Sequence, residues 1–448
     1  MPLGVDDNNE KLANTDFISE KIKQRPINRK KLLRRTVITV SLAIVFGIVA
    51  CFTFLLLQPV FSDRLYPEEA PEAISFPEET VSEELTPEDM LAYEETIAAS
   101  EAQSLEATQK DQIDEAIASY SFDASDYGKM MASLKKVADE TSKSIVTVTA
   151  LSNDTNWFSD SFESSGSASG LVIANNGTNY YILVPSTSID SAESIQVTFC
   201  DGSVATAEVS LTDTITSMSV LTVRRTSLTE STRKKVQTAT LGSSNTGKIT
   251  GNPVIAIGSP LGVQGSLSYG IITSEKTPIN LADSNYKLLT TDMDGSSKGS
   301  GVLTNLNGQI LGIINMNYNS SDLSDHISAI GITELKALIE DLSNARNRAY
   351  LGVHGATVPS ELQQQLNIPA GAYISTTDMG SPAMKAGLQS GDIITSVAYT
   401  EIASFEQLVG RLAQLAPDDI ITVTVMRQAP NDYVKLDLEV TLSSSTHN

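Results

Sequence analysis

The sequence predicts a mainly β protein whose two folded units follow a single transmembrane helix. Three observations support this: an apolar run of 22 residues near the N-terminus, an acidic stretch after it, and many short β-branched runs from about Met130. Turn-rich segments such as ANNGTN, CDGS and NLNG separate these runs, which is typical of a barrel or sandwich and not of a βαβ fold. At 448 residues the chain also exceeds what one hydrophobic core usually supports.

The apolar run, from Thr36 to Leu57, predicts a transmembrane helix over residues 36–58. At about 1.5 Å per residue it spans about 33 Å, enough to cross a bilayer core. A cleaved signal peptide would have a shorter apolar core of about 7–15 residues. Eight basic residues lie between Lys21 and Arg35, so we expect residues 1–35 to be a cytoplasmic tail and the rest to be outside the cytoplasm. The predicted location is the cell membrane, with a single pass.

Residues 59–128 are predicted to form an acidic extracytoplasmic linker. Between Pro67 and Asp126 there are eighteen acidic residues and one basic residue, Lys110. Such a stretch cannot bury enough apolar surface to offset its ordering entropy, so it should be partly disordered, with a helix possible in its Ala- and Glu-rich second half. This linker has two alternative roles: a solvated stalk, or a segment that binds cations or basic cell-wall material.

Charge and cysteine content exclude several functional classes. The net charge of −23 argues against nucleic acid as a partner, because phosphate recognition needs a basic surface. Cys51 lies in the apolar run and Cys200 in the folded part, so they form no disulfide framework. There is no Cys/His cluster with metal-ligand spacing and no phosphate-binding glycine loop, so neither a metal nor another cofactor is expected.

Two folded units follow the linker. Residues 129–343 carry most of the strand-like runs and end in a helix, ITELKALIEDL, whose apolar residues recur at 3–4 spacing. Residues 349–445 begin YLGVHG and end in two strand-like runs. Inside them, SFEQLVGRLAQLAP predicts an amphipathic helix with Ser404 as its N-cap.

Five segments, in this order, resemble the HtrA (DegP-like) family of trypsin-fold serine proteases that carry PDZ domains. They are VADETSKSIVTVTA, GSASGLVIANNGTNYYILVPSTSI, GNPVIAIGSPLGVQGSLSYGIIT, TDMDGSSKGSGVLTNLNGQILGI and GAYISTTDMGSPAMKAGLQSGDIITSV. The resemblance implies a trypsin-like double β-barrel over 129–343 and a PDZ domain over 349–445. It also implies a bacterial envelope protein that can form trimers through the barrel.

The catalytic residues of that family are not found where its motifs place them. Its histidine position corresponds to Thr187, its aspartate position to Ser217 and its nucleophile position to Gly299. A shift of one residue would bring Ser300 to the nucleophile position instead. A serine protease needs a nucleophile, a base and an orienting carboxylate, and loss of the nucleophile or base lowers turnover about a million-fold. The pattern therefore predicts a pseudoprotease.

No histidine stands in register to serve as a base for Ser300. The chain has His326, His354 and His447 only. His326 follows Asp325, which suggests an Asp–His pair, but it is interpreted as an ordinary loop histidine. His447 is next to the C-terminus and is expected to be solvated.

The second unit keeps the parts that the family uses to bind peptides. Tyr350, Leu351, Gly352 and Val353 resemble the carboxylate-binding loop, whose N–H groups hold a peptide's C-terminus while the peptide adds to a sheet edge. The helix with Leu408 and Leu412 would form the other wall of the groove. The alternative is that Leu351 and Val353 simply enter the core.

The sequence thus favours a membrane-anchored pseudoprotease that binds protein C-termini or unfolded segments. It would act as a scaffold, sensor or chaperone-like adaptor in envelope protein quality control. The alternatives are an active HtrA-family serine endopeptidase using Ser300 and a structural stalk protein with no ligand. A homotrimer is also expected, with four aromatic residues that either contact a partner or cover the barrel's own end: Phe122, Tyr127, Trp157 and Phe158.

Overall fold

The computed structural model describes residues 73–76, 123–152, 163–190, 192–245, 247–321, 324–366, 368–430 and 432–447. The predicted cytoplasmic tail, transmembrane helix and most of the acidic linker lie outside these residues, as do Phe122, Trp157 and Phe158. Among the residues that are described, no helix is both long and apolar enough to cross a bilayer.

Helix α4 (Ala124–Thr141) leads into the first barrel. Its N-terminus is fixed by a capping box, in which the Ser125 N–H donates to Asp123 and the Asp123 N–H donates to Asp126. The helix extends across residue 128, where the linker was predicted to end. Tyr127 is 63% exposed on this helix, so it does not cover the end of a barrel.

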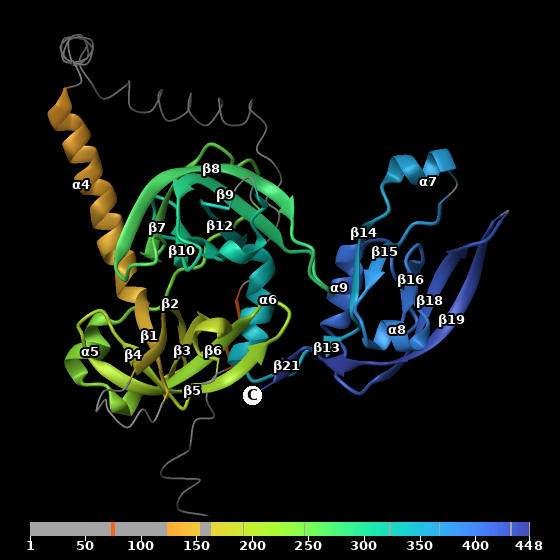
Figure 1. Ribbon diagram of the computed structural model, residues 1–448, viewed down its shortest axis with the longest axis horizontal. Coiled ribbons are helices and arrows are strands. Elements are labelled where there is room, and N and C mark those ends of the chain that lie inside the picture. Colours follow the sequence, from red (N-terminus) through yellow and green to blue (C-terminus); the bar gives the residue numbers. More distant parts are fainter. Residues whose placement is uncertain are drawn as a thin grey trace, which may run out of the picture. The chain divides into compact units, whose positions relative to one another are not determined.

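The first barrel contains six antiparallel strands. Their order is β5-β4-β1-β2-β3-β6, and a pairing between β5 and β6 closes the barrel (Figure 1). The strands and short helices of this barrel are η1 (Ser142–Ser144), β1 (Ile145–Ser152), β2 (Glu163–Asn175), β3 (Asn179–Pro185), η2 (Ser186–Ser188), β4 (Ser194–Thr198), β5 (Val204–Asp213), β6 (Met218–Arg224), η3 (Arg225–Ser227) and α5 (Glu230–Lys235).

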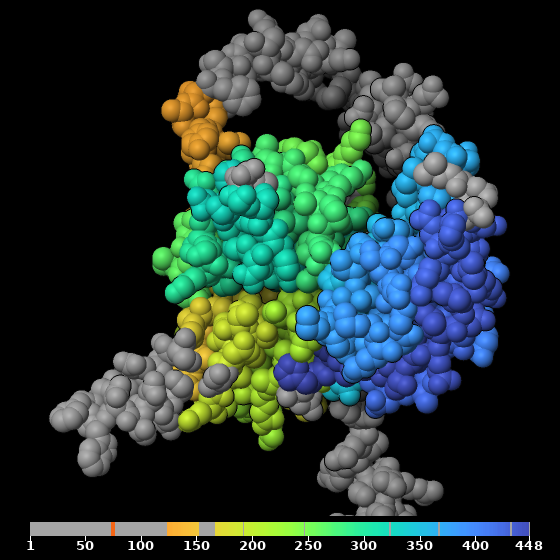
Figure 2. Space-filling view, turned by 45° about the vertical axis from the view of Figure 1, so that its right-hand side comes forward, coloured from red at the N-terminus to blue at the C-terminus, as the bar shows by residue number. Residues whose placement is uncertain are grey.

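The second barrel is a closed six-stranded sheet in the order β10-β11-β12-β9-β8-β7. Helix α6 packs on it with all four predicted apolar residues fully buried, and these are Leu335, Leu338, Ile339 and Leu342. Figure 2 shows the two barrels, coloured from yellow to teal, in direct contact. The elements are β7 (Pro253–Ser259), β8 (Ser266–Pro278), β9 (Lys287–Asp294), β10 (Ser300–Thr304), β11 (Ile310–Ile314), η4 (Met316–Tyr318), β12 (His326–Gly331) and α6 (Ile332–Ser343).

The C-terminal domain is a separate β-sheet with short helices around its own core. Its strands run in the order β14-β15-β16-β18-β19, so β14 is an edge strand, and Ser404 caps α9 as predicted. The elements are β13 (Ala349–Tyr350), β14 (Val353–Thr357), α7 (Ser360–Leu366), β15 (Ala372–Thr377), α8 (Pro382–Ala386), β16 (Ile393–Val397), β17 (Thr400–Glu401), α9 (Phe405–Leu412), β18 (Ile420–Gln428), β19 (Tyr433–Thr441) and β20 (Ser443–Ser444).

The last residues of the chain return to the first barrel. Strand β21 (Thr446–His447) pairs with β5, and the Thr214 N–H and hydroxyl both donate to the carbonyl of Ser445. The Ser445 N–H in turn donates to the carbonyl of Arg348. His447 is exposed, as expected. The chain segment that ends the C-terminal domain is therefore attached to the first barrel.

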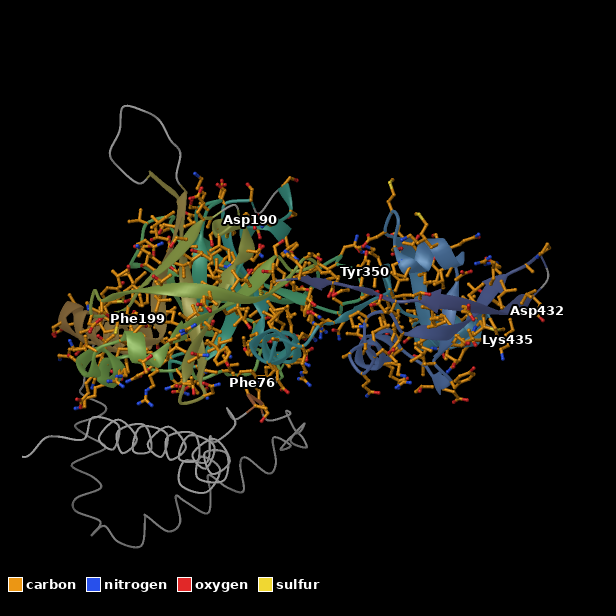
Figure 3. All side chains as sticks on the ribbon, turned by 90° about the horizontal axis from the view of Figure 1, so that it is seen from below. Phe76, Asp190, Phe199, Tyr350, Asp432 and Lys435 are labelled. Carbon is orange, nitrogen blue, oxygen red and sulfur yellow. The ribbon has the colours of Figure 1, made fainter. Side chains whose placement is uncertain are left out.

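A short piece of the predicted linker is also anchored. The Ile74 N–H donates to the side-chain oxygen of Asn344 at the end of α6, and the Asn344 amide donates back to the carbonyl of Ile74. Phe76, labelled in Figure 3, packs against the core between the barrels.

The strand orders of the three sheets confirm the predicted mainly β fold, with two barrels and a smaller C-terminal β domain.

Candidate functional site

The structure brings the predicted histidine and aspartate positions into neighbouring segments. Thr187 lies exposed in η2, and Ser217 lies in the turn between β5 and β6 with φ +53. The Ser186 N–H donates to the carbonyl of Ser217 at 2.8 Å. Neither Thr187 nor Ser217 can supply an imidazole base or a carboxylate.

The buried carboxylate closest in sequence to Ser217 is engaged within its own turn. Asp213 is 2% exposed and accepts hydrogen bonds from the Thr216 N–H at 2.9 Å and from the Thr216 hydroxyl at 2.7 Å. These two bonds tie the carboxylate to the turn between β5 and β6.

Gly299, at the predicted nucleophile position, has no space for a side chain. A Cβ there would lie 2.7 Å from the Pro260 carbonyl oxygen and 2.8 Å from that of Ser296. The Gly299 N–H donates to the same Ser296 oxygen at 2.7 Å, and the Ser296 N–H donates to Pro260. These local hydrogen bonds therefore hold the backbone in a conformation that leaves no room for a side chain at position 299.

Ser300, the alternative nucleophile, is buried at the start of β10. Its side chain is 4% exposed, and its Oγ accepts the N–H of Ser169 on β2 at 3.0 Å. A Cβ on Gly166, three residues earlier on β2, would lie 3.1 Å from the Ser188 carbonyl oxygen. Ser300 and the segment of Thr187 thus contact β2 at positions three residues apart.

The three histidines lie elsewhere. His326 begins β12 and faces Asp294, with 3.7 Å between Nδ1 and Oδ1, instead of its sequence neighbour Asp325. His354 is hydrogen-bonded within the C-terminal domain, and His447 lies in β21. Within the described residues, none of these rings is hydrogen-bonded to Ser300.

The loop predicted to bind a carboxylate does hold one, and it comes from the same chain. Asp283, in the loop between β8 and β9, accepts three backbone hydrogen bonds. The Leu351 and Gly352 N–H groups donate to Oδ2 at 2.7 and 2.8 Å, and the Val353 N–H donates to Oδ1 at 3.0 Å. The Asp283 N–H also donates to the Val353 carbonyl at 2.8 Å. Sequence reasoning missed Asp283.

The backbone of this loop is shaped for an anion. Gly352 has φ +83, a left-handed conformation that glycine adopts without strain. Successive N–H groups in such a turn point to one side and form a concave anion site. Leu351 and Val353 are both 0% exposed, so their side chains enter the core while their N–H groups point to Asp283.

A tyrosine, an aspartate and a histidine surround the loop. The Tyr350 hydroxyl donates to Asp378 Oδ2 at 2.6 Å, and His354 Nε2 is hydrogen-bonded to Asp378 Oδ1 at 2.7 Å. Tyr350 is labelled in Figure 3. Burial and the Asp378 carboxylate raise the pKa of Tyr350, while hydrogen bonds from Tyr350 and His354 lower the pKa of Asp378 although burial opposes this. His354 Nδ1 is hydrogen-bonded to Asn280 Oδ1 at 3.0 Å, so the β8–β9 loop contacts the domain twice.

Burial affects the pKa of the half-buried Asp283 more than its hydrogen bonds do. Burial raises it to about 6, although the three N–H donors act in the opposite direction. The negative Asp378 nearby adds to the rise.

The predicted groove wall lies deeper than expected. Leu408 and Leu412 on α9 are 0% and 3% exposed and belong to the core of the C-terminal domain. Helix α9 is tied to β14 through Thr357, whose hydroxyl accepts the Phe405 N–H and donates to Glu406. A groove-wall role for Leu408 and Leu412 stays a prediction.

Comparisons with known proteins agree with this architecture. The PDZ domain family matches residues 341–442. The Bacillus subtilis serine protease Do-like HtrA is 28% identical over 335 residues, covering 68% of this chain and 72% of that protein. The Escherichia coli periplasmic pH-dependent serine endoprotease DegQ is 26% identical over 292 residues, covering 63% of this chain and 60% of that protein. The chain thus spans less than two thirds of the length of DegQ.

A solved structure gives the same result for the fold. A variant of the HtrA-type protease AlgW, solved with a tripeptide, matches 69% of this chain and 97% of its own, with a TM-score of 0.50 and 21% identity. Fold, element order and comparisons together show a trypsin-like double β-barrel followed by a C-terminal PDZ domain, an architecture similar to that of HtrA-type serine proteases.

Proposed function

We propose that this protein is an inactive HtrA-type pseudoprotease that binds the C-terminal tails or unfolded segments of other proteins through its PDZ domain. The observation that carries the proposal is the set of three N–H groups, from Leu351 to Val353, that converge on one carboxylate. A single-pass anchor over residues 36–58 would place the domains outside the cytoplasm, where it would serve as a scaffold, sensor or adaptor in envelope quality control. The word "periplasmic" in the name of DegQ supports that location.

The proposed lack of proteolysis is supported by the residues at the three predicted triad positions. Thr187, Ser217 and Gly299 provide no base, carboxylate or nucleophile. The Gly299 N–H, which would be needed to stabilise an oxyanion, donates instead to Ser296. Ser300 is buried and bonded to the backbone of Ser169.

Peptide binding is supported by the free edge of β14. In the part of the chain that the structure describes, this strand pairs within its sheet with β15 alone, so its other edge can accept an extended peptide as an added strand. The carboxylate loop lies directly before β14, so the last residue of that peptide would meet the three N–H groups. The AlgW structures that match this chain were solved with a tripeptide and a decapeptide.

An active endopeptidase that uses Ser300 is the second candidate. The names of the relatives, which are serine proteases, favour it. It requires a base that the three histidines do not supply in this arrangement. In a stalk protein without a ligand, the carboxylate loop would only hold Asp283. A homotrimer through the barrel remains a proposal that light scattering of the full chain can test.

Peptides with a free C-terminal carboxylate should bind about tenfold more tightly than the same peptides as amides. Hydrogen bonds to a charged acceptor contribute about 1.5–3 kcal/mol, against about 1 kcal/mol for a neutral one. The measurement is fluorescence anisotropy of the full chain with decapeptides that differ in the last residue, each made as acid and as amide. Equal affinity for both forms would reject this binding mode.

A further inference from the structure

Asp283 occupies the carboxylate loop from a well-ordered position in the second barrel. The loop between β8 and β9 is held by the Ile279 N–H, which donates to the Tyr286 carbonyl at 3.0 Å. The Ser284 hydroxyl closes the loop on the carbonyl of Leu281, and Ala282 is 4% exposed. Asp283 itself has φ +49, an uncommon conformation for a residue with a side chain. The loop therefore presents this carboxylate in one defined orientation.

The contacts of Asp283 reproduce what the last residue of a bound peptide would offer. A peptide that adds to β14 presents a carboxylate to the N–H groups of the loop and a backbone N–H to a strand carbonyl. Asp283 presents its side-chain carboxylate to Leu351, Gly352 and Val353 and its own N–H to the Val353 carbonyl. Asn280 then continues the contact to His354, the next residue of β14.

We propose that Asp283 is an intramolecular ligand of the PDZ domain, which keeps the tail-binding site closed until an incoming C-terminal carboxylate displaces it. The inference rests on the proposed function, since it assigns regulation to the same site. The two ligands exclude each other because three N–H groups cannot serve two carboxylates. Two negative charges a few ångströms apart would also repel each other.

Closure by Asp283 sets a minimum affinity that a partner peptide needs in order to bind. Because Asp283 is part of the same chain, a peptide must compete with an effective concentration in the mM range. A site that is closed in about 90% of molecules binds its peptide about tenfold more weakly than an open one. Displacement would leave the second attachment, the pairing of β21 with β5, in place. The PDZ domain could then open without leaving the barrels.

The raised pKa of Asp283 gives the closed state a pH dependence. A carboxyl whose pKa is higher in the closed state than the ordinary 3.8 binds its proton more tightly there, so acid favours closure and this advantage is lost as the pH rises through about 6. Apparent peptide affinity should fall by up to about tenfold between pH 7.5 and pH 5. Asp283→Asn should lose the part of the pH dependence that comes from Asp283. The other titratable or charged groups nearby are the same in both proteins, and these are Asp213, Tyr286, Arg348, Tyr350, His354 and Asp378. An identical pH profile for the two proteins would contradict a titrating contact at Asp283.

The test compares the full chain with Asp283→Asn and Asp283→Ala. The matched control is Asp292→Asn, which removes a carboxylate on β9 that accepts the Ile271 N–H, away from the carboxylate loop. Two quantities are measured: hydrogen exchange of residues 350–354 by mass spectrometry, and anisotropy with the free-acid decapeptides. Asp283→Ala should speed exchange and raise peptide affinity at least about tenfold, and the control should match the wild type. Asp283→Asn keeps a neutral acceptor, as the protonated carboxyl does, so it should stay closed and bind peptide no more tightly than the wild type.

The two readouts separate the inference from the proposed function. Faster exchange without any peptide binding would keep the internal ligand and reject the peptide-binding function. Equal peptide affinity in the wild type and Asp283→Ala would keep the function and overturn the closure. Unchanged exchange in an Asp283→Ala protein of wild-type thermal stability would overturn the closure regardless of peptide binding.

Discussion

Incubated with reduced, unfolded casein, the full chain should release no fragments above the rate of a buffer control. The expected deficit relative to an active serine protease is about a million-fold, because Thr187 and Gly299 are predicted to stand at the base and nucleophile positions. Replacement of Ser300 by alanine should change nothing, since its Oγ only accepts the Ser169 N–H in a buried site. Fragment release is followed by gel and mass spectrometry.

A fluorophosphonate probe gives an independent reading of the same prediction. An activated serine reacts covalently with such a probe, whereas a buried hydroxyl without a base stays unmodified. Intact mass and peptide mapping should show no adduct at Ser300, with a commercial trypsin sample as the positive control. An adduct there that disappears in Ser300→Ala would establish the endopeptidase alternative.

Gly352→Ala should abolish capture of peptide tails, with a loss of about 100-fold or more. The new Cβ would lie 2.4 Å from the Ser381 Cβ and 2.8 Å from the Tyr350 hydroxyl, so the loop must move. Each charge-assisted N–H bond that is lost weakens binding by about 1.5–3 kcal/mol, or about 10- to 150-fold. The measurement is best made in the Asp283→Ala background, where no internal side chain competes for the loop.

Gly380→Ala is the matched control for this substitution. Gly380 has φ +73, close to the value of Gly352, but a Cβ there meets nothing within 4 Å. Both substitutions carry the left-handed strain of about 1–2 kcal/mol, and only Gly352→Ala adds the collision. Similar peptide affinities for the two variants would show that the carboxylate loop does not bind the tail.

Local patterns in the sequence were sufficient to predict much of the fold. The 3–4 spacing from Leu335 to Leu342 predicted α6 and its buried face, and Ser404 caps α9 as expected. The helix and its cap depend on residues close in sequence, because periodicity and caps act over one or two turns of a helix. The two barrels and the PDZ domain were implied instead by the resemblance of five segments, in order, to the HtrA family.

Tertiary structure decided the details of both sites. The sequence placed Gly299 at the nucleophile position, but only the fold brings the Pro260 carbonyl to within 2.7 Å of where its side chain would be. Leu408 and Leu412 follow a helical pattern that fits a groove wall and a core equally well, and the structure places them in the core.

Asp283 shows the limit most clearly. It lies in the polar loop PINLADSNYK, where a carboxylate is ordinary, and no neighbouring residue marks it as a ligand. Its three N–H donors are 68 to 70 residues further along the chain. The resemblance of residues 350–353 to a carboxylate-binding loop predicted that they could hold a carboxylate. Only packing of the barrel loop against that domain determined which carboxylate it holds, because a contact over such a separation is set by the whole fold and leaves no local pattern.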